Sequence, residues 1–163
     1  MPKTPDVLMV AAPRSYRKQK FGFKTLFLTA EQFYQNEALV QRHDEVLWQS
    51  FHTHGRYGRI ARQVEYVVVA IEKSTQYVSS ALIVPVGAKW LVEYVMTDPL
   101  YQGRGAASAV MDQVMREAKK HHIQWVILNC NPKKNQGQLL KFYAKFGFIA
   151  LPSEAPNSLR QNG

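Results

Sequence analysis

The stretch YQGRGAAS, residues 101–108, joins two segments of opposite character. Before it lies the apolar run AKWLVEYVM (88–96), which is typical of a β-strand. After it comes AVMDQVMREAKKH (109–121), whose apolar residues recur at helical spacing. Glycines and alanines fill the junction, where larger side chains would ordinarily pack. Small residues at such a point indicate that something approaches the backbone closely.

This junction is suited to binding an anion. The first turn of a helix leaves backbone N–H groups without partners inside the helix, and their partial positive charge attracts a phosphate. Gly103 and Gly105 permit unusual dihedral angles, and Arg104 adds a positive charge. Two common phosphate loops do not fit, because GxxxxGK[ST] is absent and Ser108 breaks the GxGxxG pattern. On these residues alone, a purely structural glycine turn stays open.

The other apolar patterns predict an ordered series of helices and strands. Thr29 and Gln32 form a capping-box pattern at the start of a helical segment. The predicted elements are a strand at 23–29, one or two helices at 31–51, strands at 64–72, 77–87 and 88–96, a helix at about 103–121, a strand at 124–129, a helix at about 136–146 and a short strand at 148–151. Antiparallel hairpins followed by a β-α-β unit predict an α/β (α+β) domain with a mixed sheet between helices. Whether Val7–Ala11 adds another strand is left open.

Composition limits the class of protein. The chain has 163 residues, of which 46% are hydrophobic and 20% charged, as expected for one globular domain. No apolar stretch is long enough to span a bilayer, and no signal-peptide pattern starts at Met1. Cys130 is the single cysteine, which excludes an internal disulfide and a cysteine-rich metal site. These features favour a cytoplasmic protein that does not contact a membrane.

The net charge of +9 is unusual, and many of the basic residues lie in three clusters. Such clusters favour an anionic partner, namely nucleic acid, an acidic protein surface or a phosphate-bearing cofactor. For the N-terminal cluster, a solvated surface that aids solubility is an equal alternative. The clusters are residues 1–24, the arginines Arg56, Arg59 and Arg62, and the lysines Lys133, Lys134, Lys141 and Lys145.

Two blocks of the chain resemble the GNAT acetyltransferases. QGRGAA (102–107) matches that family's Q/R-x-x-G-x-G/A signature and follows a strand ending in MTDP, while LLKFYAKFGF (139–148) resembles its second conserved block. The resemblance covers about residues 62–148, and the first 60 residues only by topology. It implies the acyl-CoA N-acyltransferase fold, with a mostly antiparallel central sheet. The whole chain, 1–163, is then one domain with a basic N-terminal segment (1–22) and an irregular tail (152–163).

The resemblance also implies the cofactor, acetyl-CoA. Its pyrophosphate would sit on the backbone amides of Gly103 to Ala107, and its pantetheine arm would pair with the preceding strand. Family members often carry an asparagine at the place of Gln136, and Asn135, one position earlier, is the candidate for that contact. The implied cofactor-binding residues are Val95, Met96, Thr97, Gln102, Gly103, Arg104, Gly105, Ala106, Ala107 and Asn135.

Two residues are candidates for proton transfer. Tyr143 matches the family's frequent general acid, which would protonate the departing thiolate, although a tyrosine there can also simply pack its ring. Glu93 is the only charged residue between Lys89 and Asp98, inside a predicted central strand. Loss of hydration there raises the pKa of a carboxylate and makes it a competent base. An ion pair with Arg62 is the alternative for Glu93.

The acceptor side is less defined. His52 and His54 suggest a metal site, but a third ligand is not evident, so no metal is expected. In the resembled family the first helices and nearby loops line the acceptor pocket, and His52, His54 and Tyr57 are therefore the substrate candidates. Cys130 is interpreted as a small buried residue, because direct attack needs no acyl-enzyme.

The leading function is an acetyl-CoA-dependent N-acetyltransferase acting on a small-molecule or peptide amine. The alternatives are the same fold acting on an aminoacyl-tRNA or protein acceptor, or a non-catalytic CoA-binding sensor or partner module. A nucleic-acid-binding protein has charge but no motif in its favour. The family usually continues with further strand after Gly147–Phe148. Either Val7–Ala11 or a second subunit of a homodimer would then fill the vacant edge.

Overall fold

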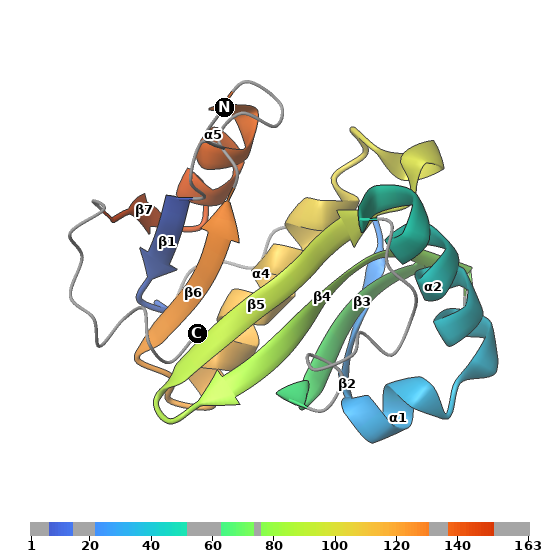
Figure 1. The fold of residues 1–163 in the computed structure, drawn as a ribbon, viewed down its shortest axis with the longest axis horizontal. Coiled ribbons are helices and arrows are strands. Elements are labelled where there is room, and N and C mark those ends of the chain that lie inside the picture. The colour runs from blue at the N-terminus through green and yellow to red at the C-terminus, as the bar shows by residue number, and fades with distance from the viewer. Residues whose placement is uncertain (1–6, 15–21, 52–62, 74–75, 131–136, 152–163) are drawn as a thin grey trace, which may run out of the picture.

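The computed structural model describes residues 7–14, 22–51, 63–73, 76–130 and 137–151. These residues form one seven-stranded mixed sheet, in the order β2-β3-β4-β5-β6-β1-β7, with helices on both faces (Figure 1). The predicted fold class, a mostly antiparallel sheet flanked by helices, is confirmed. No helix in the described ranges is both long and apolar enough to cross a membrane.

The chain enters the larger half of the sheet at β2 (Lys24–Thr29). Thr29 then starts α1 (Ala30–Tyr34) with the predicted capping box: its hydroxyl accepts from the Gln32 N–H at 3.1 Å, and the Gln32 side chain accepts from the Thr29 N–H at 2.9 Å. A second helix, α2 (Glu37–Phe51), follows directly. The segment predicted as one or two helices is therefore two.

Three antiparallel strands rich in valine and isoleucine make the centre of the sheet. They are β3 (Tyr66–Glu72), β4 (Gln76–Val86) and β5 (Lys89–Thr97). A β-bulge interrupts the ladder between β4 and β5. Ser80 pairs with Met96 but Leu82 pairs with Glu93, so β5 carries an extra residue there. Tyr94 takes up the extra residue with a φ of 51°, an uncommon angle for a non-glycine residue.

The β-α-β unit follows β5. A short 3₁₀ turn, η1 (Pro99–Tyr101), leads to α4 (Ala106–Lys120), which returns the chain to β6 (Trp125–Cys130). The predicted helix at 103–121 begins later, because Gly103 and Gly105 both have positive φ angles and cannot continue a right-handed helix. β5 and β6 run parallel, but they pair only where Lys89–Leu91 of β5 lie beside Trp125–Ile127 of β6. Beyond these residues the two strands diverge (Figure 1).

The vacant edge beside β6 is filled by the N-terminal segment. β1 (Val7–Ala11) lies antiparallel to β6, and β7 (Ile149–Ala150) pairs with the other side of β1. Of the two alternatives left open by the sequence, the structure shows the first. α5 (Gln138–Ala144) precedes β7, within the helix predicted at about 136–146.

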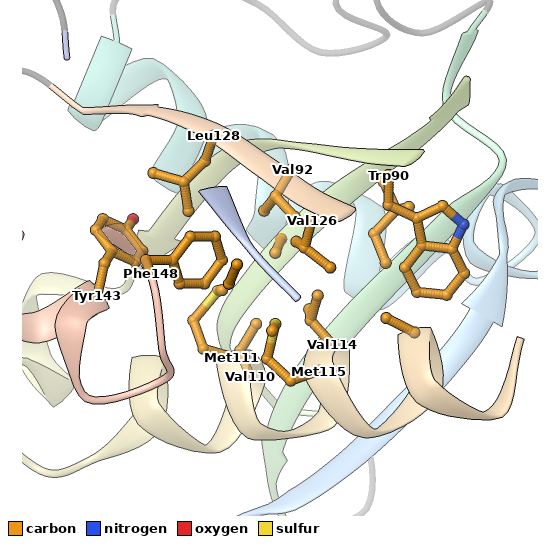
Figure 2. Close-up of a cluster of buried hydrophobic side chains, with 14 of the residues drawn as sticks. Trp90, Val92, Val110, Met111, Val114, Met115, Val126, Leu128, Tyr143 and Phe148 are labelled. Atoms are coloured by element: carbon orange, nitrogen blue, oxygen red, sulfur yellow. The ribbon is translucent and has the colours of Figure 1, made fainter. Parts of the chain in front are cut away.

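Two cores lie on opposite faces of the sheet. α4 and α5 cover one face, where Trp90, Val92, Met111 and Tyr143 belong to the same buried cluster (Figure 2). α1 and α2 cover the other, with Leu91 among the buried residues there. Side chains alternate between the two cores along β5 except at the bulge, so the alternation and the bulge together give the side of each candidate residue on this strand.

Candidate functional site

The glycine turn leaves the start of α4 open. Gly103 and Gly105 have φ angles of 79° and 86°, and Gly105 is the N-cap of α4. A glycine cap has no side chain, and no cap hydrogen bond from a side chain forms there. The first helical bond runs from the Ala109 N–H to the Gly105 carbonyl at 3.0 Å. The amides of Ala106, Ala107 and Ser108 precede that bond and carry the positive end of the helix dipole.

A cavity of about 510 Å³ lies against this helix start. One wall comes from the end of β5, another from the turn and the first residues of α4, and the third from α5. The lining residues are Val95, Thr97, Tyr101, Gln102, Gly103, Gly105, Ala106, Ala107, Ser108, Gln138, Leu139, Phe142, Tyr143 and Lys145. The two sequence blocks that resemble the acetyltransferases thus line the same cavity.

Of the predicted cofactor residues that the structure describes, most line this cavity and two, Met96 and Arg104, do not. The Met96 side chain is 5% exposed and buried in the opposite core, while its carbonyl accepts a hydrogen bond from the Ser79 hydroxyl at 2.7 Å. The guanidinium of Arg104 lies 5.3 Å from the centre of the Tyr101 ring. A cation–π contact therefore occupies the Arg104 side chain, which was predicted to add charge for the anion.

Tyr101 connects the glycine turn to the sheet. Its hydroxyl donates to Glu72 Oε2 at 2.5 Å and accepts from Gln76 Nε2 at 2.8 Å, which ties the turn to the β3–β4 hairpin. The ring packs with Val78 and with Ala106, the first residue of α4. Tyr101 was not singled out from the sequence. Its role depends on residues that are distant in the chain.

Tyr143 lies on α5 at the edge of the cavity. It is 7% exposed, and its ring packs against Phe142 and Phe148, with centroids 5.0 and 5.8 Å away. Burial is the main cause that raises the pKa of Tyr143 well above its usual value. The phenol therefore stays protonated at neutral pH, which is the form that donates a hydrogen bond or a proton. The Tyr143 side chain thus both packs its ring and lines the cavity.

Glu93 lies on the other side of the sheet from Tyr143. Leu91, two residues earlier, packs in the α2-side core, and Tyr94 packs against the same core through an edge-to-face contact with Phe51 at 5.0 Å. The bulge therefore keeps Glu93 and Tyr94 both toward α2, whereas Val95 turns to the cavity. Glu93 is half-buried, and this desolvation raises the pKa of its carboxyl.

Lys145 is a cavity residue that no sequence pattern singles out. It belongs to the third basic cluster and was not among the candidate site residues. It is nevertheless the one charged side chain among the described residues that line the cavity. Lys141, one turn earlier on α5, is exposed and does not line it. The position of α5 in the folded protein separates the two lysines.

Several predicted residues lie outside the described residues. They are the substrate candidates His52, His54 and Tyr57, the cofactor candidate Asn135, and Arg62, the alternative partner of Glu93.

The fold agrees with the comparisons to known proteins. Residues 29–158 match the family described as acetyltransferase (GNAT) domain, and the chain belongs to that family. No curated protein sequence matches the chain significantly.

Solved structures with the same fold share little sequence with this chain. A putative GNAT-family acetyltransferase from Novosphingobium aromaticivorans superposes with a TM-score of 0.68 at 17% identity, over 90% of this chain and 60% of its own. A GCN5-related N-acetyltransferase from Sphaerobacter thermophilus has a TM-score of 0.66 and 14% identity, and the match covers 92% of this chain and 50% of that protein. A GNAT-family acetyltransferase from Staphylococcus aureus has a TM-score of 0.61 and 16% identity, and the match covers 83% of this chain and 91% of that protein. This chain thus spans 60% and 50% of the first two proteins.

Proposed function

We propose that this protein transfers the acetyl group of acetyl-CoA to an amine by direct attack on the thioester. The observation that carries the proposal is the cavity between the open start of α4 and α5, because both family motifs line it. The amides at the start of α4 bind the pyrophosphate, and Gly103 and Gly105 let the phosphates approach the backbone. Lys145 supplies a further positive charge from the opposite wall.

The pantetheine arm lies along β5. Where β5 and β6 diverge after Leu91, the backbone of β5 near Val95 and Thr97 borders the cavity instead of a neighbouring strand. An extended chain with amide groups adds to such an edge as a further strand does. The thioester then lies near the bulge, where an amide of β5 stabilises the negative oxygen of the tetrahedral intermediate.

The two proton-transfer roles fall on opposite sides of the thioester. Glu93, on the α2 side, takes the proton of the attacking amine, directly or through water, because its raised pKa makes it a stronger base than an ordinary glutamate. Tyr143, on the cavity side, donates to the departing thiolate of coenzyme A. The amine nitrogen bonds to the acetyl carbon as the carbon–sulfur bond breaks. The proton that the amine loses goes to Glu93, and the proton that the thiolate gains comes from Tyr143. Solvent then takes a proton from Glu93 and returns one to Tyr143, so the net proton transfer is from the amine to the thiol.

The test is a titration followed by an activity screen. Calorimetry with acetyl-CoA measures binding, and release of the coenzyme A thiol is then followed with a panel of amine acceptors beside a no-acceptor control. Binding together with acceptor-dependent release supports the proposal. Binding with no release for any acceptor favours the non-catalytic CoA-binding module, and absence of binding refutes both.

The charge of the chain favours a second acceptor class. With a net charge of +9, the protein attracts anionic partners such as an aminoacyl-tRNA or an acidic protein surface. Binding to tRNA would weaken steeply with added salt, since each phosphate contact releases counterions. A salt-dependent complex whose bound aminoacyl group is acetylated would support this acceptor over a small amine.

A further inference from the structure

Asp98 fixes the chain where it leaves β5. It is 2% exposed, and its N–H donates to the Val78 carbonyl at 2.8 Å. Its own carbonyl accepts from the Tyr101 N–H at 2.8 Å, and its Oδ1 accepts from the Leu100 N–H at 3.0 Å. These bonds hold the η1 turn, which leads into the glycine turn.

The remaining carboxylate oxygen of Asp98 joins a distant helix. Asp98 Oδ2 accepts from Nε of Arg42 at 3.1 Å and also from its Nη2. Arg42 lies on α2, and its Nη1 donates to Glu45 at 2.5 Å, so the guanidinium is held between two carboxylates. Hydrogen bonding to Asp98 is the main cause that raises the pKa of Arg42. Without this cation, the buried carboxylate of Asp98 would lose hydration, and among the described residues the Leu100 N–H would be its remaining hydrogen-bond donor.

The glycine turn needs support of this kind. Glycine loses more backbone freedom on folding than any other residue, and Gly103 and Gly105 have no side chains with which to pack. The positions of their amides depend on fixed points outside the turn. Asp98 and Tyr101 are such points, since each bonds to residues distant in the sequence and both lie in the short segment between β5 and Gly103.

We propose that Arg42 and Asp98 are a positioning pair for the cofactor turn, which rests on the function proposed above. Neither residue lines the cavity, so neither touches the cofactor. Together they tie the turn to α2, and this sets where the amides of Gly103 to Ala107 stand when the pyrophosphate arrives. Breaking the pair loosens the turn and weakens coenzyme A binding while the sheet stays folded.

The chain offers a matched control pair. Asp112 on α4 is 3% exposed and accepts from Nε of Arg116 at 3.1 Å. It is a carboxylate as buried as Asp98, with an arginine at the same distance, but it lies beyond the first turn of α4 and does not line the cavity. Asp112→Asn therefore removes a comparable charge without touching the cofactor turn.

The experiment titrates each variant with coenzyme A by calorimetry and follows its thermal unfolding in parallel. We expect Arg42→Gln and Asp98→Asn each to raise the Kd for coenzyme A at least tenfold. Asp112→Asn should change this Kd less than twofold, even if it lowers the Tm as much as the other two variants do. In the double variant, the loss of affinity for coenzyme A should not exceed that of whichever single variant binds more weakly, because the two residues act as one unit.

Each outcome of this experiment supports or refutes the positioning role or the proposed function. Equal affinity of wild type and Arg42→Gln, or an equal loss in Asp112→Asn, overturns the positioning role while leaving the proposed function intact. Failure of the wild type to bind coenzyme A refutes the proposed function itself. Should Asp98→Asn not fold, Arg42→Gln decides alone, because the Arg42 side chain is 33% exposed and its replacement can be hydrated.

Discussion

Gly103→Ala separates a backbone effect on stability from an effect on cofactor binding. A Cβ built at Gly103 meets nothing within 4 Å, so the alanine causes no clash in the free protein. The cost comes from the φ angle of +79°, which disfavours an L-residue by about 1–2 kcal/mol. For a chain of this size that corresponds to a Tm lower by roughly 2–8 °C.

The same methyl group projects where the cofactor is proposed to bind. Gly103 lines the cavity, and a Cβ there would displace a phosphate from the amides. Loss of one charge-assisted hydrogen bond costs about 1.5–3 kcal/mol, which is roughly a 10- to 150-fold rise in the Kd for coenzyme A. Calorimetric titration measures this rise, and differential scanning calorimetry measures the Tm.

Gly87→Ala is the matched control. Gly87 also has a positive φ, of +60°, and open space around its Cβ position, but it lies between β4 and β5 at the end of β5 far from the turn. We expect a similar fall in Tm and unchanged affinity for coenzyme A. The reasoning is wrong if both variants lose affinity equally, or if Gly103→Ala binds coenzyme A as tightly as the wild type.

Three further predictions concern side chains. Tyr143→Phe should lower kcat about 10²- to 10⁴-fold in the thiol-release assay and leave the Kd for coenzyme A unchanged. Because desolvation raises the pKa of Glu93, wild-type kcat/KM should fall on acidification at a higher pH than an ordinary glutamate would cause. Glu93→Gln should lose that pH dependence together with most turnover. Lys145→Gln should raise the KM for acetyl-CoA several-fold at low salt and less at high salt, while Lys141→Gln should leave it unchanged.

Stability supplies an independent check on Glu93. A carboxyl whose pKa is raised by folding binds its proton more tightly in the folded state, so its favourable contribution exists in acid and is lost as the pH rises through the folded pKa. Glu93→Gln should therefore raise the Tm at neutral pH and leave it unchanged in acid. Equal effects at both pH values would show that the desolvation argument is wrong.

Local chemistry made much of the fold predictable. The capping box at Thr29 and the glycines before α4 depend on residues close in sequence, and the structure has both where they were expected. The bulge in β5 was not predicted, because its left-handed residue is Tyr94 and no glycine marks the place. Its consequence, Glu93 and Val95 on opposite faces, could not be read from the alternation of the strand.

Contacts between distant segments were beyond sequence reasoning. Arg42 and Asp98 are 56 residues apart, and no local pattern relates them. Lys145 and Lys141 look alike in sequence, and the position of α5 in the fold brings one of them to the cavity. The place of Val7–Ala11 beside β6 was foreseen as one of two alternatives, since a vacant edge shows that a strand is needed but not which strand fills it.

The position of β1 has a consequence for biosynthesis. Its two neighbours, β6 and β7, come from the last part of the described chain, so β1 leaves the ribosome well before them and waits without either partner until they have been made. Pairings between such distant segments close slowly. Until β1 pairs with it, β6 presents an open edge that can recruit a strand from another molecule. We expect yield and solubility to depend on an intact β1 more than a strand of five residues suggests.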